Sequence, residues 1–173
     1  ASGGGKSSLC AYIYGSRIDY LGRLWFDNTD TSTLSIADWQ QIRRVSIAYL
    51  PQELDLFPEL TAIENIRLKA SLTDSASEER IRGWMRELGI DFRADYPVGR
   101  MSIGQQQRVA IIRSICQPFD FILLDEPVSH LDEENNRIAA RMIVREADRL
   151  GAGIITTSVG NRILIDGLKT IRL

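Results

Sequence analysis

The pattern of apolar and polar positions predicts helices over much of the chain. Residues 61–64 and 75–78 have the form of capping boxes, and each box is followed by apolar residues at helical spacing. The second of these helices is expected to end at Gly89. Because a further helix is predicted over residues 103–116, residues from about 60 to 115 are expected to form a mostly helical block.

Shorter apolar runs predict the strands. Residues 22–28 and 47–50 are expected to be strands of a small β-rich region, and Pro51 ends the second. Residues 121–124 are apolar without alternation, which is typical of a parallel strand covered on both faces. The next strand is predicted at residues 153–157.

The last part of the chain predicts one long helix and one hairpin. Asp132 is expected to cap a helix that ends near Leu150, with Gly151 as its stop. Residues 163–171 read as a hairpin on the two-residue turn Asp166-Gly167. Strands and helices therefore alternate, and the predicted fold class is α/β.

Length, charge and composition exclude several classes of function. A chain of 173 residues is about one domain, with room for a second small subdomain. Its formal net charge of −2 argues against broad nucleic-acid binding, which favours a basic face. No apolar run approaches the roughly 20 residues of a membrane helix. Cys10 and Cys116 each lie in an apolar helical pattern, so we expect small core residues in a reducing cytosol.

A glycine-rich stretch with one lysine precedes the apolar run at residues 9–13. Glycine lets main-chain N–H groups approach phosphate oxygens, and the helix that follows adds unpaired N–H groups and its dipole. Lys6 supplies a mobile charge and Ser7 an oxygen for Mg²⁺. A flexible linker would explain the glycines but not the Lys-Ser pair. The stretch therefore predicts a polyphosphate-binding loop, formed by Ser2, Gly3, Gly4, Gly5, Lys6, Ser7 and Ser8.

The loop begins abruptly. The pattern G-x-x-x-x-G-K-[ST] needs a glycine five positions before Gly5, which would precede Ala1. A strand normally leads into such a loop. We therefore expect the sequence to be an N-terminally truncated piece of a longer protein.

Two carboxylates follow the predicted strand at residues 121–124. In an open α/β sheet, ligands bind outside the carboxyl ends of the strands, so Asp125 and Glu126 are expected beside the phosphate loop. Asp125 can hold Mg²⁺ together with Ser7, and Glu126 can orient or deprotonate an attacking water. The alternative is a surface pair that caps the next element.

The order of four motifs resembles the ATP-binding cassette of ABC transporters over nearly the whole chain. Gln52 follows a strand and Pro51, and later come the segments 101–108, 121–127 and 129–132. The resemblance implies an α/β P-loop NTPase with a mostly parallel core sheet, a small antiparallel β part and an inserted helical subdomain at about 60–115. Residues 57–65 also resemble the branch that includes lipoprotein-release and macrolide-export cassettes.

The resemblance implies a role for each motif. The ligand is expected to be ATP with Mg²⁺, and Gln52 to touch the metal and the attacking water. Ser102, Gly104 and Gln105 belong to the signature segment, which contacts the γ-phosphate held by a second cassette, and Asp132 belongs to the D-loop. The alternative for Ser102 to Gln105 is a plain capping box. Gly104 and the run of residues 105–108 are not needed for a cap, which favours the functional interpretation.

Two positions depart from the family pattern. Ile103 stands where the family usually has the first of two glycines, and Ser158 stands where it has a histidine that contacts the γ-phosphate. We count Ser158 as the residue at that catalytic position. A serine hydroxyl is shorter and carries no positive charge. His130, in the variable position of the D-loop, is interpreted as an interface or surface residue.

The expected function is ATP hydrolysis that drives a membrane permease through head-to-tail pairing with a second cassette. The resemblance implies a cytoplasmic protein held on the inner face of the membrane by that permease, with no direct nucleic-acid contact. Two alternatives stay open. One is a degenerate or regulatory cassette with slow turnover, and the other is a cytosolic ABC protein that acts on nucleic acid or ribosomes.

Overall fold

The computed structural model describes residues 5–171 and confirms the α/β class. The elements, in chain order, are α1 (Lys6–Ile13), β1 (Trp25–Phe26), β2 (Thr29–Asp30), α2 (Ile36–Val45), β3 (Ile47–Leu50), α3 (Ala62–Ala70), α4 (Glu78–Glu87), α5 (Ile103–Ile115), β4 (Phe121–Asp125), α6 (Glu133–Leu150) and β5 (Gly153–Thr157). Short 3-10 turns stand at Thr31–Thr33, Asp91–Arg93 and Val98–Arg100.

A parallel sheet of order β3-β4-β5 forms the centre of the described chain. The register pairs Leu50 with Leu124 and Asp125 with Thr157, so the three strands end at the same edge. Leu123 and Leu124 point to opposite faces of β4 and are both fully buried, because helices cover both faces of the strand. This is the continuous apolar strand that the sequence predicts.

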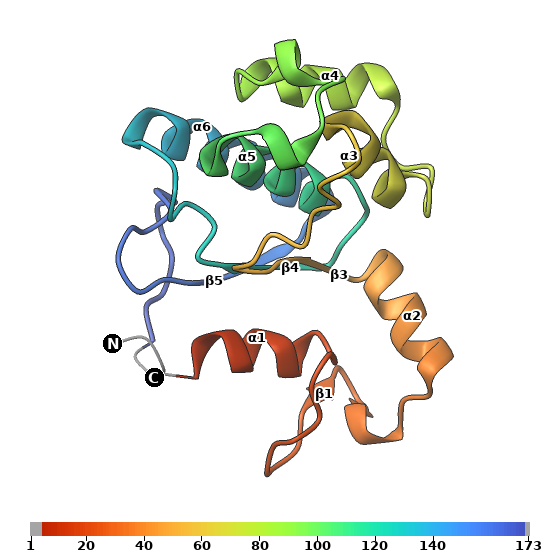
Figure 1. Cartoon of the computed structure of the whole chain (residues 1–173). Helices are drawn as coiled ribbons and strands as arrows, with labels where there is room; N and C mark the ends of the chain where they lie inside the picture. The colour runs from red at the N-terminus through yellow and green to blue at the C-terminus, as the bar shows by residue number, and fades with distance from the viewer. Residues whose placement is uncertain (1–4, 172–173) are drawn as a thin grey trace.

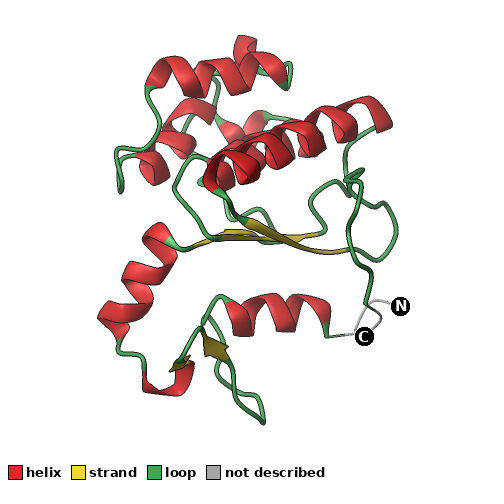
Figure 2. Ribbon diagram, turned by 180° about the vertical axis from the view of Figure 1, so that it is seen from behind, coloured by secondary structure: helices red, strands yellow, loops and turns green. Residues whose placement is uncertain are grey.

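The helices form a layer on each face of the sheet. In Figures 1 and 2, α1 lies on one face with the β1–β2 hairpin near its end, and α3 to α6 cover the other face. Helix α1 packs against β4, α5 against β3 and α6 against β5. Helix α5 also contacts α3 and α4, so it joins the helical block to the sheet.

The long helix α6 begins and ends as predicted. The side chain of Asp132 accepts a hydrogen bond from the main-chain N–H of Asn135 at 2.8 Å. Gly151 ends the helix at φ +66°, a left-handed conformation that glycine adopts without a Cβ clash. Gly89, at φ +63°, similarly follows α4.

The place of β3 differs from the prediction. It was expected in the small β-rich region, whereas it is a strand of the core sheet beside β4. The antiparallel part consists of β1 and β2 in the described residues. Between them and β3 stands α2, which the pattern analysis missed. It begins at a capping box in which Ser35 and Asp38 bond each other's main-chain N–H groups.

The start of α4 is also corrected. Ser77, rather than Ser75, caps the helix by accepting a hydrogen bond from the N–H of Arg80. The hydroxyl of Ser75 instead donates to the carbonyl of Cys116 at 2.6 Å. Because that hydroxyl is bound to another element, the helix begins two residues later than the sequence box suggests.

The predicted hairpin at residues 163–171 is not formed. The turn at Asp166-Gly167 exists, with Gly167 at φ +77°, but no strands flank it in the described residues. Asn136 of α6 instead binds the segment, donating to the carbonyl of Arg162 and accepting from the N–H of Leu164. An isolated two-stranded hairpin is only marginally stable, so these contacts with α6 decide the conformation.

Candidate functional site

The start of α1 is an open cluster of main-chain donors. Gly5 precedes the helix at φ +74° and no side chain caps it, so the first N–H groups, from Lys6 onward, lack helical acceptors. The first turn contains no acidic residue. Both features favour an anion at this helix end. Ser2, Gly3 and Gly4, which were predicted for the same loop, lie outside the described residues.

The side chains at the start of α1 differ in exposure. Lys6 is half-buried and Ser7 is exposed. The hydroxyl of Ser8 accepts a hydrogen bond from Arg17 Nη1 at 3.1 Å, and Arg17 in turn pairs with Asp19. Sequence reasoning missed this pair, in which Asp19 balances the charge of Arg17 beside the predicted phosphate loop.

Asp125 ends β4 in a buried position, with 2% of its surface exposed. Its Oδ1 accepts a hydrogen bond from the hydroxyl of Thr157, the last residue of β5. Burial, and then the negative charge of Asp125, raise the pKa of the Cys10 thiol in α1 to about 12. Cys10 therefore stays protonated at neutral pH, and both cysteines are buried and free, as predicted.

Glu126 follows with a strained main chain. Its φ is +51°, a region that residues with a side chain occupy at a cost of about 1–3 kcal/mol. Its N–H donates to the carbonyl of Thr157 at 3.1 Å. Its carbonyl accepts from the side chain of Gln107 at 3.1 Å and from the N–H of Ser129 at 3.3 Å. These bonds hold the conformation and leave the half-buried carboxylate without a hydrogen-bond partner among residues 5–171.

Gln52 lies in the exposed loop after β3. Since Leu50 pairs with Leu124, this loop leaves the sheet next to the Asp125–Glu126 turn. Leu54 and Asp55 both have positive φ, at 63° and 49°. Arg113 of α5 stabilises the loop, donating to the carbonyl of Asp55 at 2.7 Å and to that of Leu54 at 3.3 Å. Sequence reasoning missed this arginine.

The predicted signature segment starts α5. Ser102 and Gln105 form a reciprocal capping box, so the structural part of the alternative interpretation is correct. A Cβ on Gly104 would lie 2.9 Å from the carbonyl oxygen of His130, so a glycine is needed for α5 to approach the loop before α6. This close approach is a structural reason for Gly104 apart from the cap, so the glycine by itself does not favour the functional interpretation.

The glutamine run also has structural partners. Gln106 donates to the carbonyl of Met101 at 3.0 Å, and Arg108 to that of Leu88 at 2.9 Å. Gln107 connects α5 with the Glu126 turn and the loop before α6. The prediction that residues 105–108 serve no cap is wrong for Gln105, whose side chain accepts a hydrogen bond from the N–H of Ser102. Residues 106–108 have the structural contacts described above.

Asp132 and His130 lie on the exposed loop that leads into α6. Hydrogen bonds from the main-chain N–H and the side chain of Asn135 lower the pKa of Asp132, so its carboxylate already serves as the helix cap. His130 is exposed, as predicted, and its Nδ1 lies 3.0 Å from the hydroxyl of Ser129.

Ser158 is half-buried and follows Thr157 at the end of β5. The adjoining segment is bound to the loop before α6, because Asn161 donates to the carbonyls of Val128 and Leu131. In Figure 1, the start of α1, the end of β4 and the start of α6 are all on the left side of the molecule, with α1 below the sheet and α6 above it. The fold thus brings Ser158 and the Asp125–Glu126 pair to the sheet edge nearest the start of α1.

The donor set at this edge fits Mg²⁺. Asp125 Oδ2 has no hydrogen-bond partner among residues 5–171, and the hydroxyl of Ser7 and the amide oxygen of Gln52 lie on exposed residues. Mg²⁺ takes few protein oxygens and keeps several waters. No cluster of three or more His, Cys, Asp or Glu side chains suited to a metal occurs in the described chain, and Mg²⁺ with phosphates requires none.

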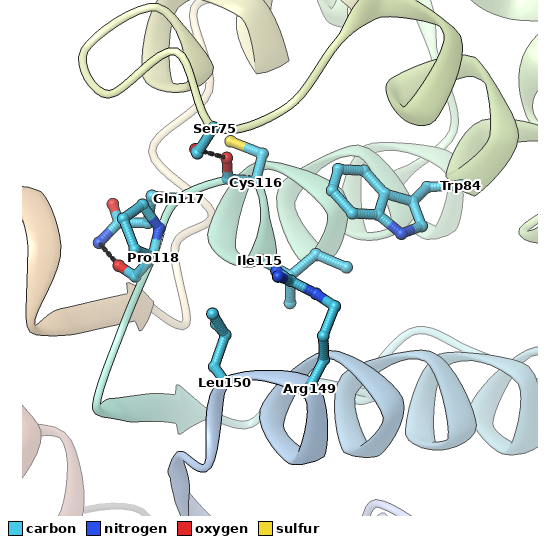
Figure 3. A pocket seen from close by; sticks show the side chains of 8 residues that line it. All are labelled: Ser75, Trp84, Ile115, Cys116, Gln117, Pro118, Arg149 and Leu150. Carbon is cyan, nitrogen blue, oxygen red and sulfur yellow. Dashed lines mark hydrogen bonds between the residues drawn. The ribbon is translucent and has the colours of Figure 1, made fainter.

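A separate cavity of about 80 Å³ lies among the helices above the sheet. Figure 3 shows Trp84 of α4, Ile115 of α5, and Arg149 and Leu150 of α6 around it. Ligand pockets usually measure about 300–1,000 Å³. None of the predicted site residues lines this cavity, which is too small for a nucleotide. Among the described residues, no helix has the length and apolar character needed to cross a bilayer.

Comparisons with known proteins identify the family of this chain. The family model described as ABC transporter matches residues 1–129. An uncharacterised ABC transporter ATP-binding protein of Mycobacterium tuberculosis is 33% identical over 90% of this chain and 48% of its own length. The macrolide export ATP-binding/permease protein MacB of Burkholderia pseudomallei is 30% identical over 100% of this chain and 27% of its own length. This chain therefore spans about half, or less, of the length of these relatives.

A solved structure with a similar fold is also an ABC transporter cassette. The dimeric structure of the ABC transporter cassette MJ0796 has a TM-score of 0.78 at 28% identity and covers 91% of this chain and 71% of its own. That cassette has also been solved in a post-hydrolysis state bound to ADP and Pi. The family match spans more than half of the chain, and the fold agrees with that of a P-loop NTPase. The protein thus belongs to the ABC transporter family, as an ATP-binding cassette.

Proposed function

We propose that this cassette binds and hydrolyses MgATP and, by closing on a second cassette, drives a membrane permease. The observation that carries the proposal is the Asp125–Glu126 pair at the end of the buried strand β4. Asp125 is fixed by Thr157, and Glu126 is held in a strained conformation at the sheet edge beside the start of α1. Strain of this kind clusters at active sites.

We assign phosphate binding to the predicted loop and the start of α1. The predicted loop residues 2–8 offer main-chain N–H groups, and Lys6 adds a charge for the β- and γ-phosphates. Ser7, Gln52 and Asp125 would hold Mg²⁺, whose charge neutralises the phosphate oxygens.

Hydrolysis is assigned to Glu126. Its carboxylate, without a hydrogen-bond partner in the described chain, would orient the attacking water and accept its proton. Ser158 at the end of β5 is the residue proposed to donate to the γ-phosphate. The separation of roles follows from burial: Asp125 is enclosed by β5 and α1, while Glu126 is one residue farther out.

A second cassette would complete the site. Ser102 is exposed, and Ile103 beside it keeps 49% of its surface exposed, so the start of α5 is free to contact another molecule. We propose that Ser102, Gly104 and Gln105 contact the γ-phosphate held by that partner, and that Asp132 lies at the interface. The dimeric assembly of MJ0796 supports this arrangement.

A permease is the proposed partner in the membrane. The relatives named as ATP-binding/permease proteins support it. The cassette would then sit on the cytoplasmic face of the membrane. Direct nucleic-acid binding is not expected at a formal net charge of −2, which also disfavours the alternative of a cassette that acts on nucleic acid or ribosomes.

A second candidate function is a regulatory cassette with slow turnover. Ser158 favours it, because a hydroxyl contributes less than a histidine to a developing negative charge. Ile103 favours it as well, since its exposed side chain stands where a partner's nucleotide would approach.

Mixing two inactive variants tests the shared site. Lys6→Ala damages the phosphate loop and Ser102→Arg blocks the signature segment, so each variant alone should hydrolyse little ATP. In a head-to-tail pair of the two, both defects fall in one site and the other site is intact. We expect the mixture of intact proteins to regain turnover. Mixtures that stay inactive, although each variant still pairs with the wild type, would contradict the proposal.

A further inference from the structure

Gln107 is a buried polar residue in the second turn of α5, with 1% of its surface exposed. Its Nε2 donates to the main-chain carbonyl of Glu126 at 3.1 Å and to the hydroxyl of Ser129 at 3.3 Å. Its Oε1 accepts from the N–H of His130 at 2.8 Å. Both the nitrogen and the oxygen of the side-chain amide thus have partners, and these partners lie between β4 and α6.

The bond to Glu126 acts on a strained main chain. Glu126 stands at φ +51°, and such a conformation persists only where surrounding contacts determine it. Its N–H is fixed by Thr157, and Gln107 supplies a side-chain donor to its carbonyl. Without that donor, the remaining bond to the carbonyl comes from Ser129 at 3.3 Å.

The same side chain lies between two parts of the site. Gln107 stands on α5, three residues after Gly104, where the helix approaches the carbonyl of His130 so closely that a Cβ would be 2.9 Å away. The Glu126 turn, residues 129–130 and the start of α5 are therefore joined through one buried amide and one close contact.

We propose that Gln107 is a positioning residue for ATP hydrolysis. It fixes the main chain of Glu126 so that the carboxylate faces the attacking water, and it transmits the position of the signature segment to the catalytic carboxylate of the same chain. This inference rests on the proposed function, in which Glu126 acts on that water. Displacement of a catalytic group by about 1 Å can cost about 10²-fold in rate.

The test compares two glutamines of one helix in the intact protein. Gln107→Met keeps the side-chain length and removes the hydrogen bonds, while Gln107→Asn keeps the amide and shortens its reach. Gln106→Met is the matched control, because Gln106 bonds to Met101 and not to Glu126. For each variant we would measure kcat, KM, the ATP dissociation constant and ATP-dependent pairing.

A positioning role predicts that kcat falls about 10- to 100-fold in both Gln107 variants, while KM, ATP affinity and pairing stay within about twofold of wild type. Gln106→Met should keep the wild-type kcat. An unchanged kcat in either Gln107 variant would overturn the inference. A loss of kcat matched by an equal loss of ATP affinity and pairing would overturn it too, because that is the result of a structural role.

Glu126→Gln, measured alongside, separates this inference from the proposed function. If Glu126→Gln keeps normal turnover, the proposed function itself has failed. If Glu126→Gln abolishes turnover and Gln107→Met does not change it, only the role of Gln107 is refuted.

Discussion

The hydroxyl of Thr157 donates a hydrogen bond to Oδ1 of Asp125, joining the last residues of two parallel strands. Both side chains are buried, with 8% and 2% of their surfaces exposed. A buried carboxylate oxygen that loses its donor costs the protein its desolvation energy. The pair therefore matters for stability and for the direction in which Asp125 presents its second oxygen.

Thr157→Val removes this donor and keeps the shape. We expect a loss of about 1–3 kcal/mol in the free energy of unfolding, together with a higher Mg²⁺ concentration for half-maximal ATPase activity. Urea unfolding and a Mg²⁺ titration measure the two effects. Thr156→Val is the matched control, because the Thr156 hydroxyl is buried without a hydrogen-bond partner in the described chain. Equal stability changes in both variants would contradict the role of the Thr157 bond.

Ser158→His should raise turnover. A histidine at the end of β5 supplies a longer donor that can carry positive charge, and one preorganised donor is worth about 10²–10³-fold in rate. Steady-state ATP hydrolysis of the intact protein measures the change, and Ser158→Ala shows whether the native hydroxyl contributes. An unchanged rate in Ser158→His would count against the second candidate function, in which Ser158 slows turnover.

The elements that were predicted correctly are those whose own residues contain the signal, as a cap or as an apolar run. Helix α6 has an N-cap at Asp132 and a glycine stop at Gly151, and β4 has an apolar run that only a strand covered on both faces requires. Helix α2 lacked a buried apolar stripe, since none of its residues is fully buried. Its Ser35–Asp38 box was the one local signal that could have identified it.

The errors concern partners that are distant in sequence. The four residues of β3 are compatible both with a small β-rich region and with the core sheet. Only the pairing of β3 with β4 shows that the strand belongs to the core sheet. The turn at residues 166–167 looks like a hairpin until Asn136 binds the segment before it.

The site residues, too, were predicted where the signal is local and missed where it depends on a distant partner. The strand-end rule placed Asp125 and Glu126 correctly at the sheet edge, because the rule follows from chain direction alone. The sequence did not predict the roles of Thr157, Gln107 and Arg113. Each of these side chains donates to an acceptor on another element, and that acceptor cannot be identified before the fold is known.

A buried ion-pair cluster links α4 with α6. Glu146, with 3% of its surface exposed, accepts from Arg80 at 2.6 Å, Arg149 at 2.9 Å and the indole of Trp84 at 3.2 Å. Glu146→Gln should lower the free energy of unfolding by about 3 kcal/mol, the low end for breaking a buried pair, because both arginines keep contact with water. Glu87→Gln, which breaks an exposed pair with Arg145, should cost less than about 1 kcal/mol.

The effect of Glu146 depends on pH. Burial alone would raise its pKa, but hydrogen bonds from Arg149 and Trp84 and the charges of Arg80 and Arg149 lower the pKa below the ordinary 4.5. A carboxylate whose folded pKa is depressed stabilises the fold above its unfolded pKa and loses that effect as the pH falls through its folded pKa. Urea unfolding should therefore show the full gap between wild type and Glu146→Gln at pH 7 and a shrinking gap below pH 4.5. A gap that does not change with pH would contradict the assignment.

The central claim is that Glu126, held at the end of β4, performs ATP hydrolysis in this cassette. The most direct measurement is the rate of MgATP hydrolysis by the intact protein and by Glu126→Gln, with ATP affinity measured on both. We expect the wild type to turn over MgATP and Glu126→Gln to lose at least about 10²-fold in kcat at unchanged ATP affinity. A Glu126→Gln variant that hydrolyses ATP at the wild-type rate, or a wild type that binds ATP and never hydrolyses it, would contradict the role of Glu126 in hydrolysis.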